Sequence, residues 1–341
     1  MKRILFCLLA LLFVCAPVRA QWEYYDDEDT ETYSEEYSDE NYWDDEEELL
    51  LWDDEEEELA QPLGWSSYLL FVFLAILPAI ALLAFILWRD RLRPEPPKEL
   101  AIAFLLGTLT VPMALVLGSL LGQAGLYPPY QEGWRDCLRV AFFGAALPEE
   151  FVKLVILWIF FRWRKHQNEF MDGIVYATCI GLAFATLENI MYVLNASGAQ
   201  DFSTEPLALS VCVTRALMAV PGHFGFAILM GFFFSFYLFS PKNKGLFLAL
   251  AYVVPVLFHG AYDFFAFLEQ NAGVWINVVS FGFFFAFFLM SKLCFKAIRT
   301  SLKLDDKAYS VALAQRKPLG DEDKQTDNGG GDCAEQDGAG A

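Results

Sequence analysis

Eight ionisable residues lie inside long apolar stretches of this 341-residue sequence. In chain order they are Glu149, Glu150, Lys153, Glu188, Arg215, His223, His259 and Asp263. Glu149 and Lys153 are four residues apart, and His259 and Asp263 have the same spacing, so each pair would share one helix face. Carboxylates and imidazoles are zinc ligands, and a catalytic zinc takes three protein ligands and a water. These residues could therefore hold a metal ion that activates water.

The formal charge of this set leaves two explanations open. Four carboxylates and two cations leave a charge of −2 in an interior of low dielectric constant. A divalent metal bound to neutral imidazoles would balance that charge, and two protonated carboxylic acids would balance it equally well. Taken singly, Glu149 and Lys153 could also form a structural ion pair. His223 could satisfy backbone carbonyls freed by the preceding Pro-Gly pair.

The elements that must position these residues are predicted to be membrane helices. The sequence is 56% hydrophobic and contains 33 Phe, a composition typical of a polytopic membrane protein. Of seven apolar spans, all but the fifth have about the length that crosses a bilayer, and the fifth is long enough to tilt, break or extend beyond it. Spans of this kind must be helical. They cover residues 65–88, 101–122, 137–161, 173–194, 208–239, 245–268 and 273–291. The predicted fold is therefore an all-α polytopic membrane protein with about seven transmembrane helices.

The ionisable residues are distributed unevenly over these spans. The interiors of the first, second and seventh spans contain none, whereas the third to sixth spans contain all eight. Charged groups inside a bilayer usually face the interior of a helix bundle or a polar cavity. We therefore expect the third to sixth helices to enclose one site.

Lysine and arginine in the connecting loops predict the orientation. Basic residues concentrate in alternate connections, namely 89–100, 162–172, 240–244 and the segment after residue 291. The intervening loops contain Arg135 as their single basic residue. This pattern predicts an integral protein of the cell (cytoplasmic, or inner) membrane with an extracytoplasmic N-terminus and a cytoplasmic C-terminus.

The two ends of the chain differ from the membrane domain, which we place at residues 61–300. Residues 1–20 have the layout of a signal peptide cleaved after Ala20, although a retained first helix is the alternative. Residues 21–60 contain 21 Asp and Glu and no Lys or Arg, which predicts a disordered extracytoplasmic segment. That segment could be a simple solvated tail or an arm that binds calcium or a partner. Residues 301–341 are predicted to be a disordered cytoplasmic tail.

Two classes of interaction receive no support from the composition. The acidic segment accounts for most of the net charge of −20, and the chain has no basic patch for a nucleic acid. The seven cysteines show no spacing typical of an external disulfide or a cysteine zinc site. The expected partners are the lipid bilayer and a membrane-anchored protein.

The motifs that carry these residues resemble those of the PrsW family of intramembrane metalloproteases, in the wider group that includes the CAAX prenyl endopeptidases. The matching pieces are Glu149-Glu150-x-x-Lys153, Phe184-x-x-x-Glu188-Asn189, His223, and His259-x-x-x-Asp263. They occur in the family's order on four successive spans, and the resemblance covers roughly residues 65–295. It implies a metal-dependent endopeptidase, with zinc as the expected metal, that cuts membrane-anchored proteins such as an anti-sigma-factor-like regulator.

The resemblance also implies roles for single residues. Glu149 would be the general base for a metal-bound water, and Glu150 a second catalytic or ligating carboxylate. The metal would be held by further residues drawn from Glu188, His223, His259 and Asp263, with His223 as a ligand or an oxyanion stabiliser. Lys153 and Arg215 would keep the carboxylates ionised or stabilise the oxyanion, and Asn189 would support the ligands from outside. The prenyl endopeptidases have a histidine where this chain has Glu188, so the ligand set is expected to be richer in carboxylate.

Two other functions are compatible with the residue pattern alone. A noncatalytic membrane scaffold could use the polar residues for helix pairing, and a proton- or cation-coupled transporter could use them as a relay. A transporter is expected to show an internal repeat, and the seven spans show none. A scaffold would bind no stoichiometric metal.

Overall fold

The computed structural model describes residues 65–131, 133–164, 168–198, 205–269 and 275–315. The predicted signal peptide and acidic segment lie outside the described residues. Within them, every regular element is a helix: α2 (Trp65–Arg89), α3 (Pro97–Thr108), α4 (Thr110–Gln123), α5 (Trp134–Arg139), η1 (Val140–Ala146), α6 (Leu147–Trp163), α7 (Phe170–Gly198), α8 (Glu205–Thr214), η2 (Arg215–Ala219), α9 (Val220–Phe239), α10 (Lys244–Glu269) and α11 (Ile276–Gln315). The prediction of an all-α polytopic protein is confirmed.

Six helices of the described chain are long and apolar enough to cross a membrane. They correspond to the predicted spans except the third, and they cover Leu69–Arg89, Pro97–Gln123, Phe170–Asn195, Leu209–Phe239, Lys244–Leu268 and Ile276–Leu313. The predicted span 137–161 is instead formed by α5, η1 and α6, which follow one another without a break. It is less apolar than the six because it carries Glu149, Glu150 and Lys153.

Helices α7 and α9 form the centre of the bundle. Most of the residues in their apolar stretches are buried, whereas fewer than a third are buried in the apolar stretches of α2, α3–α4, α10 and α11, as expected for helices that face lipid. A Cβ atom on Gly231 of α9 would collide with the backbone carbonyl of Gly173 on α7. Small residues at such a crossing let two helix backbones touch. This contact fixes the distance between the helices that carry Glu188 and His223.

Two π-helical segments interrupt the helices that carry the site, and a proline follows closely after each of them. Segment η1 ends two residues before Pro148, and η2 ends two residues before Pro221. Proline has no backbone N–H, and its ring clashes with the carbonyl four residues earlier, which lies inside the π segment in both cases. A wider π turn relieves that clash, and such turns are frequent at functional sites. Glu149 and His223 follow these two turns closely.

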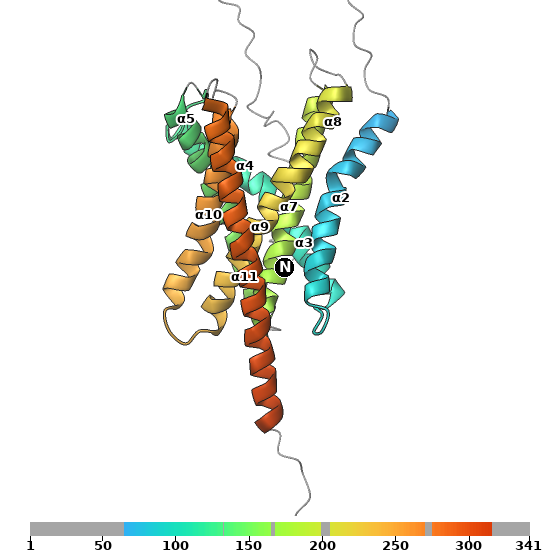
Figure 1. Ribbon diagram of the computed structural model, residues 1–341, viewed down its shortest axis with the longest axis vertical. Coiled ribbons are helices and arrows are strands. Elements are labelled where there is room, and N and C mark those ends of the chain that lie inside the picture. The colour runs from blue at the N-terminus through green and yellow to red at the C-terminus, as the bar shows by residue number, and fades with distance from the viewer. Residues whose placement is uncertain (1–64, 132, 165–167, 199–204, 270–274, 316–341) are drawn as a thin grey trace, which may run out of the picture.

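Helix α11 extends well beyond the other helices at one end of the bundle, and α5 and the starts of α2 and α8 lie at the other end (Figure 1). The helix continues to Gln315, so the structure differs here from the predicted tail that begins at residue 301. Asp305 explains the extension, because its carboxylate accepts hydrogen bonds from the backbone N–H groups of Phe170 and Met171 at 2.6 and 3.0 Å. Ser301 and Asp305 are buried in this contact.

Candidate metal centre and active site

The first wall of the site is the beginning of α6, where Glu149, Glu150 and Lys153 lie within one turn. Lys153 Nζ donates to Glu150 Oε1 at 2.8 Å and to Glu149 Oε2 at 3.2 Å. The ammonium group also lies 3.8 Å from the centroid of the Phe184 ring on α7. Glu150 is fully buried, whereas 13% of the Glu149 side chain is exposed. The two adjacent glutamates therefore occupy different environments, and Glu149 is the more accessible of the two.

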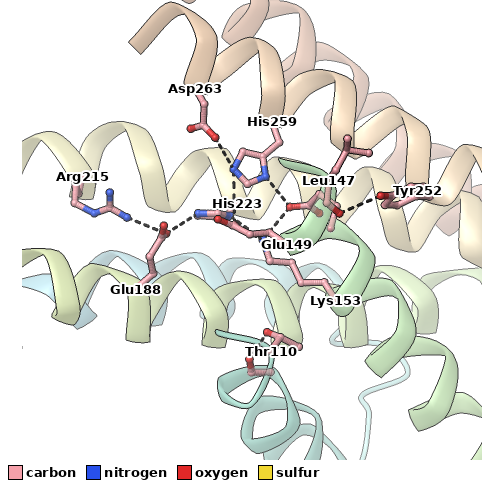
Figure 2. Close-up of polar contacts among 12 residues, drawn as sticks. Thr110, Leu147, Glu149, Lys153, Glu188, Arg215, His223, Tyr252, His259 and Asp263 are labelled. Atoms are coloured by element: carbon pink, nitrogen blue, oxygen red, sulfur yellow. Dashed lines mark hydrogen bonds and ion pairs between the residues drawn. The ribbon is translucent and has the colours of Figure 1, made fainter. Parts of the chain in front are cut away.

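Two histidines from α9 and α10 close the site. Lys153 Nζ lies 3.3 Å from His223 Nδ1, and His259 Nδ1 lies 2.9 Å from Glu150 Oε1. The two imidazole rings meet at a centroid distance of 5.1 Å. Gly260 allows the close approach of α10, because a Cβ atom at this position would come within 2.5 Å of the Phe142 ring on η1. Figure 2 shows both histidines close to Glu149 of α6.

The remaining predicted residues surround the histidines on their outer side. Glu188 Oε2 accepts a bond from His223 Nε2 at 2.9 Å, and Asp263 Oδ2 lies 3.2 Å from His259 Nε2. Arg215 Nη2 in turn donates to Glu188 at 2.8 Å. Each histidine thus has a carboxylate on Nε2, an arrangement that fixes the orientation of an imidazole that binds a metal.

Asn189 connects this outer layer to another helix. Its side-chain oxygen accepts a bond from Arg215 Nε at 2.8 Å, and its amide nitrogen donates to the Ala75 carbonyl of α2 at 3.0 Å. The Arg215 guanidinium also lies 3.8 Å from the ring centroid of Tyr192. Arg215 and Asn189 therefore hold Glu188 in position.

Tyr252 contributes to the site and was not among the predicted residues. Its hydroxyl donates to the Leu147 carbonyl at 3.0 Å, so α10 is tied to the first turn of α6 (Figure 2). Tyr252 lies two helical turns before His259 and shares its face. That spacing was the only signal in the sequence, and it could not reveal that the Leu147 carbonyl lies opposite.

Four of the predicted residues fit a metal ion by their geometry. Glu149, Glu150, His223 and His259 each offer one ligand atom, and these atoms lie within 4.8 Å of one another. Glu150 Oε2 is buried and has no hydrogen-bond partner within the described chain, which is unfavourable unless a cation or water meets it. Carboxylate oxygens and imidazole nitrogens are the donors that zinc accepts. The Lys153 ammonium contacts three of the four residues and partly neutralises the charge of the two glutamates.

Comparison with known proteins decides what kind of protein carries this cluster. Residues 95–291 match the family described as PrsW family intramembrane metalloprotease, and this match includes all eight ionisable residues. The chain belongs to the PrsW family of intramembrane metalloproteases. It is therefore an integral membrane protein and a peptidase.

Several relatives of the PrsW family align over most of their length. Protease PrsW of Clostridioides difficile is 35% identical over 208 residues, which cover 60% of this chain and 83% of the relative. Protease PrsW of Geobacillus kaustophilus is 31% identical over 60% of this chain and 82% of its own, and that of Bacillus subtilis is 32% identical over 55% and 79%. No solved structure matches the chain significantly. Membership of the PrsW family favours a peptidase over the scaffold and the transporter.

Proposed function

We propose that this PrsW family member hydrolyses peptide bonds of membrane-anchored proteins with the help of a zinc ion. Glu150, His223 and His259 would hold the ion, and Glu149 would be a further ligand whenever Glu149 is not acting as a base. The observation that supports the proposal is the clustering of these four residues from three helices within 4.8 Å, together with the unpartnered oxygen of buried Glu150. A divalent metal bound there would polarise the scissile carbonyl and lower the pKa of a water molecule.

Glu149 is the best candidate for the general base. Both of its contacts, with Lys153 Nζ at 3.2 Å and with His259 Nε2 at 3.8 Å, involve the same oxygen, Oε2. Partial exposure gives its carboxylate access to water and to a peptide, which fully buried Glu150 does not have. Glu149 would accept a proton from the attacking water and pass it to the nitrogen of the leaving amine as the C–N bond breaks.

The other residues would hold these groups in place. Lys153 is fixed between Glu149, Glu150 and the Phe184 ring, so it would keep the two carboxylates at a set separation. Glu188 and Asp263 would orient His223 and His259 through their Nε2 atoms. In this proposal Arg215 is a positioning residue, since its guanidinium is bonded to Glu188 and Asn189.

We further propose that substrates reach the site from outside the cell. Glu188 lies about ten residues from the end of α7 at Gly198, or ~15 Å, and Asp263 about six residues from the end of α10, or ~9 Å. The loops that follow these two helix ends lack basic residues, which favours an extracytoplasmic position. A membrane-anchored regulator of the anti-sigma-factor type would present its external segment there.

Metal analysis combined with cleavage tests the proposal. Protein purified in detergent is expected to contain about one zinc per chain, and His259→Ala to contain none while still inserting in the membrane. Glu149→Gln is expected to lose cleavage of a tagged single-span substrate. Zinc content that is the same in wild type and His259→Ala, or cleavage that survives in Glu149→Gln, would contradict the assigned site.

The position of the cut tests the direction of access. A single-span substrate with different tags at its two ends should yield fragments cut at or near its external boundary. Fragments cut only on the cytoplasmic side would refute outward access and leave the metal assignment intact.

A further inference from the structure

A second polar site lies where the loop after α2 passes α11, and the proposed peptidase chemistry uses none of it. Residues 89–93 of this loop, together with Leu302 and Asp306 of α11, line a cavity of about 180 Å³. The Arg93 guanidinium lies 2.8 Å from Glu169 at the start of α7 and 3.2 Å from Asp306. These two ion pairs hold the loop against the bundle and so fix the walls of the cavity.

The other two arginines of the cavity have no counter-charge of their own. Arg89 and Arg91 lie over the ring of Trp88, with their guanidinium carbons 5.6 and 4.9 Å from the ring centroid. Neither forms an ion pair with a carboxylate in the part of the chain that the structure describes. Two guanidinium groups beside one ring repel each other, and an anion shared between them would relieve that repulsion.

The negative groups of the cavity do not cancel this charge. Burial, and then nearby carboxylates led by Glu95, raise the pKa of Asp90 to about 8, so Asp90 is mostly protonated and neutral at pH 7. Asp306 is already paired with Arg93. The C-terminal end of α2 contributes roughly half a negative charge, which is less than the charge of two guanidinium groups. The cavity is therefore positively charged and favours an anion.

The position of the cavity indicates that this anion belongs to a lipid. The apolar span of α2 ends at Arg89, so the cavity lies where a membrane helix leaves the hydrocarbon. Trp88 and Leu92 beside the arginines are 53% and 80% exposed. Tryptophan is enriched at the level of the lipid head groups. A lipid would meet both the arginines and these apolar side chains, whereas a soluble phosphate would meet only the arginines.

We propose that this cavity binds the phosphate group of an anionic phospholipid, with Arg89 and Arg91 as its direct contacts. A guanidinium group presents a planar set of N–H donors that matches two phosphate oxygens. The cavity of about 180 Å³ has room for a phosphate group, since one water takes roughly 30 Å³. Basic pockets between membrane helices on the cytoplasmic side bind lipid head groups, and the arginines of this loop favour that side.

The bound lipid would connect α2 with α11. Its phosphate would lie between the arginines of the loop and Leu302 of α11, and it would reduce the repulsion between Arg89 and Arg91. The contact between the loop and the α11 extension would then depend on the fraction of anionic lipid in the membrane. The proposal stands independently of the zinc centre and of the peptidase reaction.

Lipid binding by the full-length chain in detergent tests the proposal. Native mass spectrometry would count the molecules of phosphatidylglycerol or of zwitterionic phosphatidylcholine that stay bound as each lipid is titrated. Wild type is expected to hold phosphatidylglycerol about tenfold more tightly than phosphatidylcholine. Equal affinities would overturn the proposal. A large excess of inorganic phosphate should leave the phosphatidylglycerol bound, and its displacement would overturn the assignment of a lipid by showing a site for soluble phosphate.

Arg89→Gln/Arg91→Gln is the decisive variant, and Lys242→Gln/Lys244→Gln is its control because it removes two exposed charges from another basic loop. The arginine pair should weaken phosphatidylglycerol binding about tenfold, and the lysine pair by less than about twofold. Equal effects of the two variants would overturn the proposal.

Arg89→Lys/Arg91→Lys keeps both positive charges and removes the planar guanidinium groups, so it also guards against a loss of folding in the glutamine variant. Its affinity for phosphatidylglycerol should lie between those of wild type and Arg89→Gln/Arg91→Gln. An affinity equal to that of wild type would show that charge alone attracts the lipid, and would overturn direct contacts between the guanidinium groups and the phosphate.

Discussion

Removal of the Arg215 guanidinium tests whether Arg215 and Glu188 together position the imidazole of His223. Arg215→Met deletes the bonds to Glu188 and Asn189 and leaves the Glu188 carboxylate inside the bundle without its cation. Breaking a fully buried ion pair costs about 3 to 5 kcal/mol. The two side chains here are 17% and 18% exposed, so we expect a smaller loss of about 2 kcal/mol. For a chain of this size that corresponds to a Tm lower by roughly 3 to 4 °C.

The double variant Arg215→Met/Glu188→Gln separates stability from catalysis. Replacement of the orphaned carboxylate by an amide removes the buried charge, so the double variant should recover at least half of the lost Tm. Its cleavage rate should nevertheless stay about 10- to 100-fold below wild type, because His223 no longer has an ionised carboxylate on Nε2. Tm in detergent and the rate of cleavage of a single-span substrate are the two measurements.

Lys242→Met is the matched control, since Lys242 is an exposed cation in the loop before α10 and should change neither quantity. The reasoning is refuted if the double variant is less stable than Arg215→Met alone. It is also refuted if the double variant cleaves at the wild-type rate, because Glu188 would then have no part in orienting His223.

Three further predictions follow from single contacts. Glu149→Gln should reduce kcat by at least ~100-fold, because the variant lacks the general base. Its Tm should stay within about 2 °C of wild type, because the Glu149 side chain is partly exposed. A kcat equal to that of wild type would mean that another residue transfers the proton. Tyr252→Phe removes one hydrogen bond to Leu147, worth about 1 kcal/mol, and should lower kcat about fivefold at unchanged KM; an effect confined to KM would contradict a positioning role. Gly231→Ala should lower Tm strongly, because the backbones of α7 and α9 touch at Gly231. Gly245 faces open space, so Gly245→Ala should leave Tm unchanged. Equal Tm values for the two variants would contradict the close packing of α7 against α9.

Much of the site could be inferred from the sequence because membrane helices make ionisable residues conspicuous. A charged residue in a span is expected to face the bundle, so the eight residues were predicted to converge, and the structure brings them together. Helical periodicity also placed Glu149 with Lys153 and His259 with Asp263, and both pairs are in contact. These inferences needed only composition and spacing.

The division of labour among those residues was not accessible from spacing. Glu188 and Asp263 remain predicted metal ligands or close partners of the ligands; their carboxylates contact the Nε2 atoms of the histidines, while the four residues that offer ligand atoms within 4.8 Å of one another include both glutamates of α6. The directions of Glu149, Glu150 and His223 follow the winding of α6 and α9, and π turns precede Pro148 and Pro221 in these helices. Periodicity assumes a regular helix, so it cannot register a local change of winding.

The sequence by itself determined that this is a polytopic helical protein and which eight residues meet, because hydrocarbon excludes charge from every other position. Only the tertiary structure decided which atoms face each other: the Tyr252 hydroxyl on the Leu147 carbonyl, the Lys153 ammonium among Glu149, Glu150 and His223, and Asp305 on the start of α7. Those contacts depend on how closely backbones approach at Gly231 and Gly260, which is a property of packed pairs of helices.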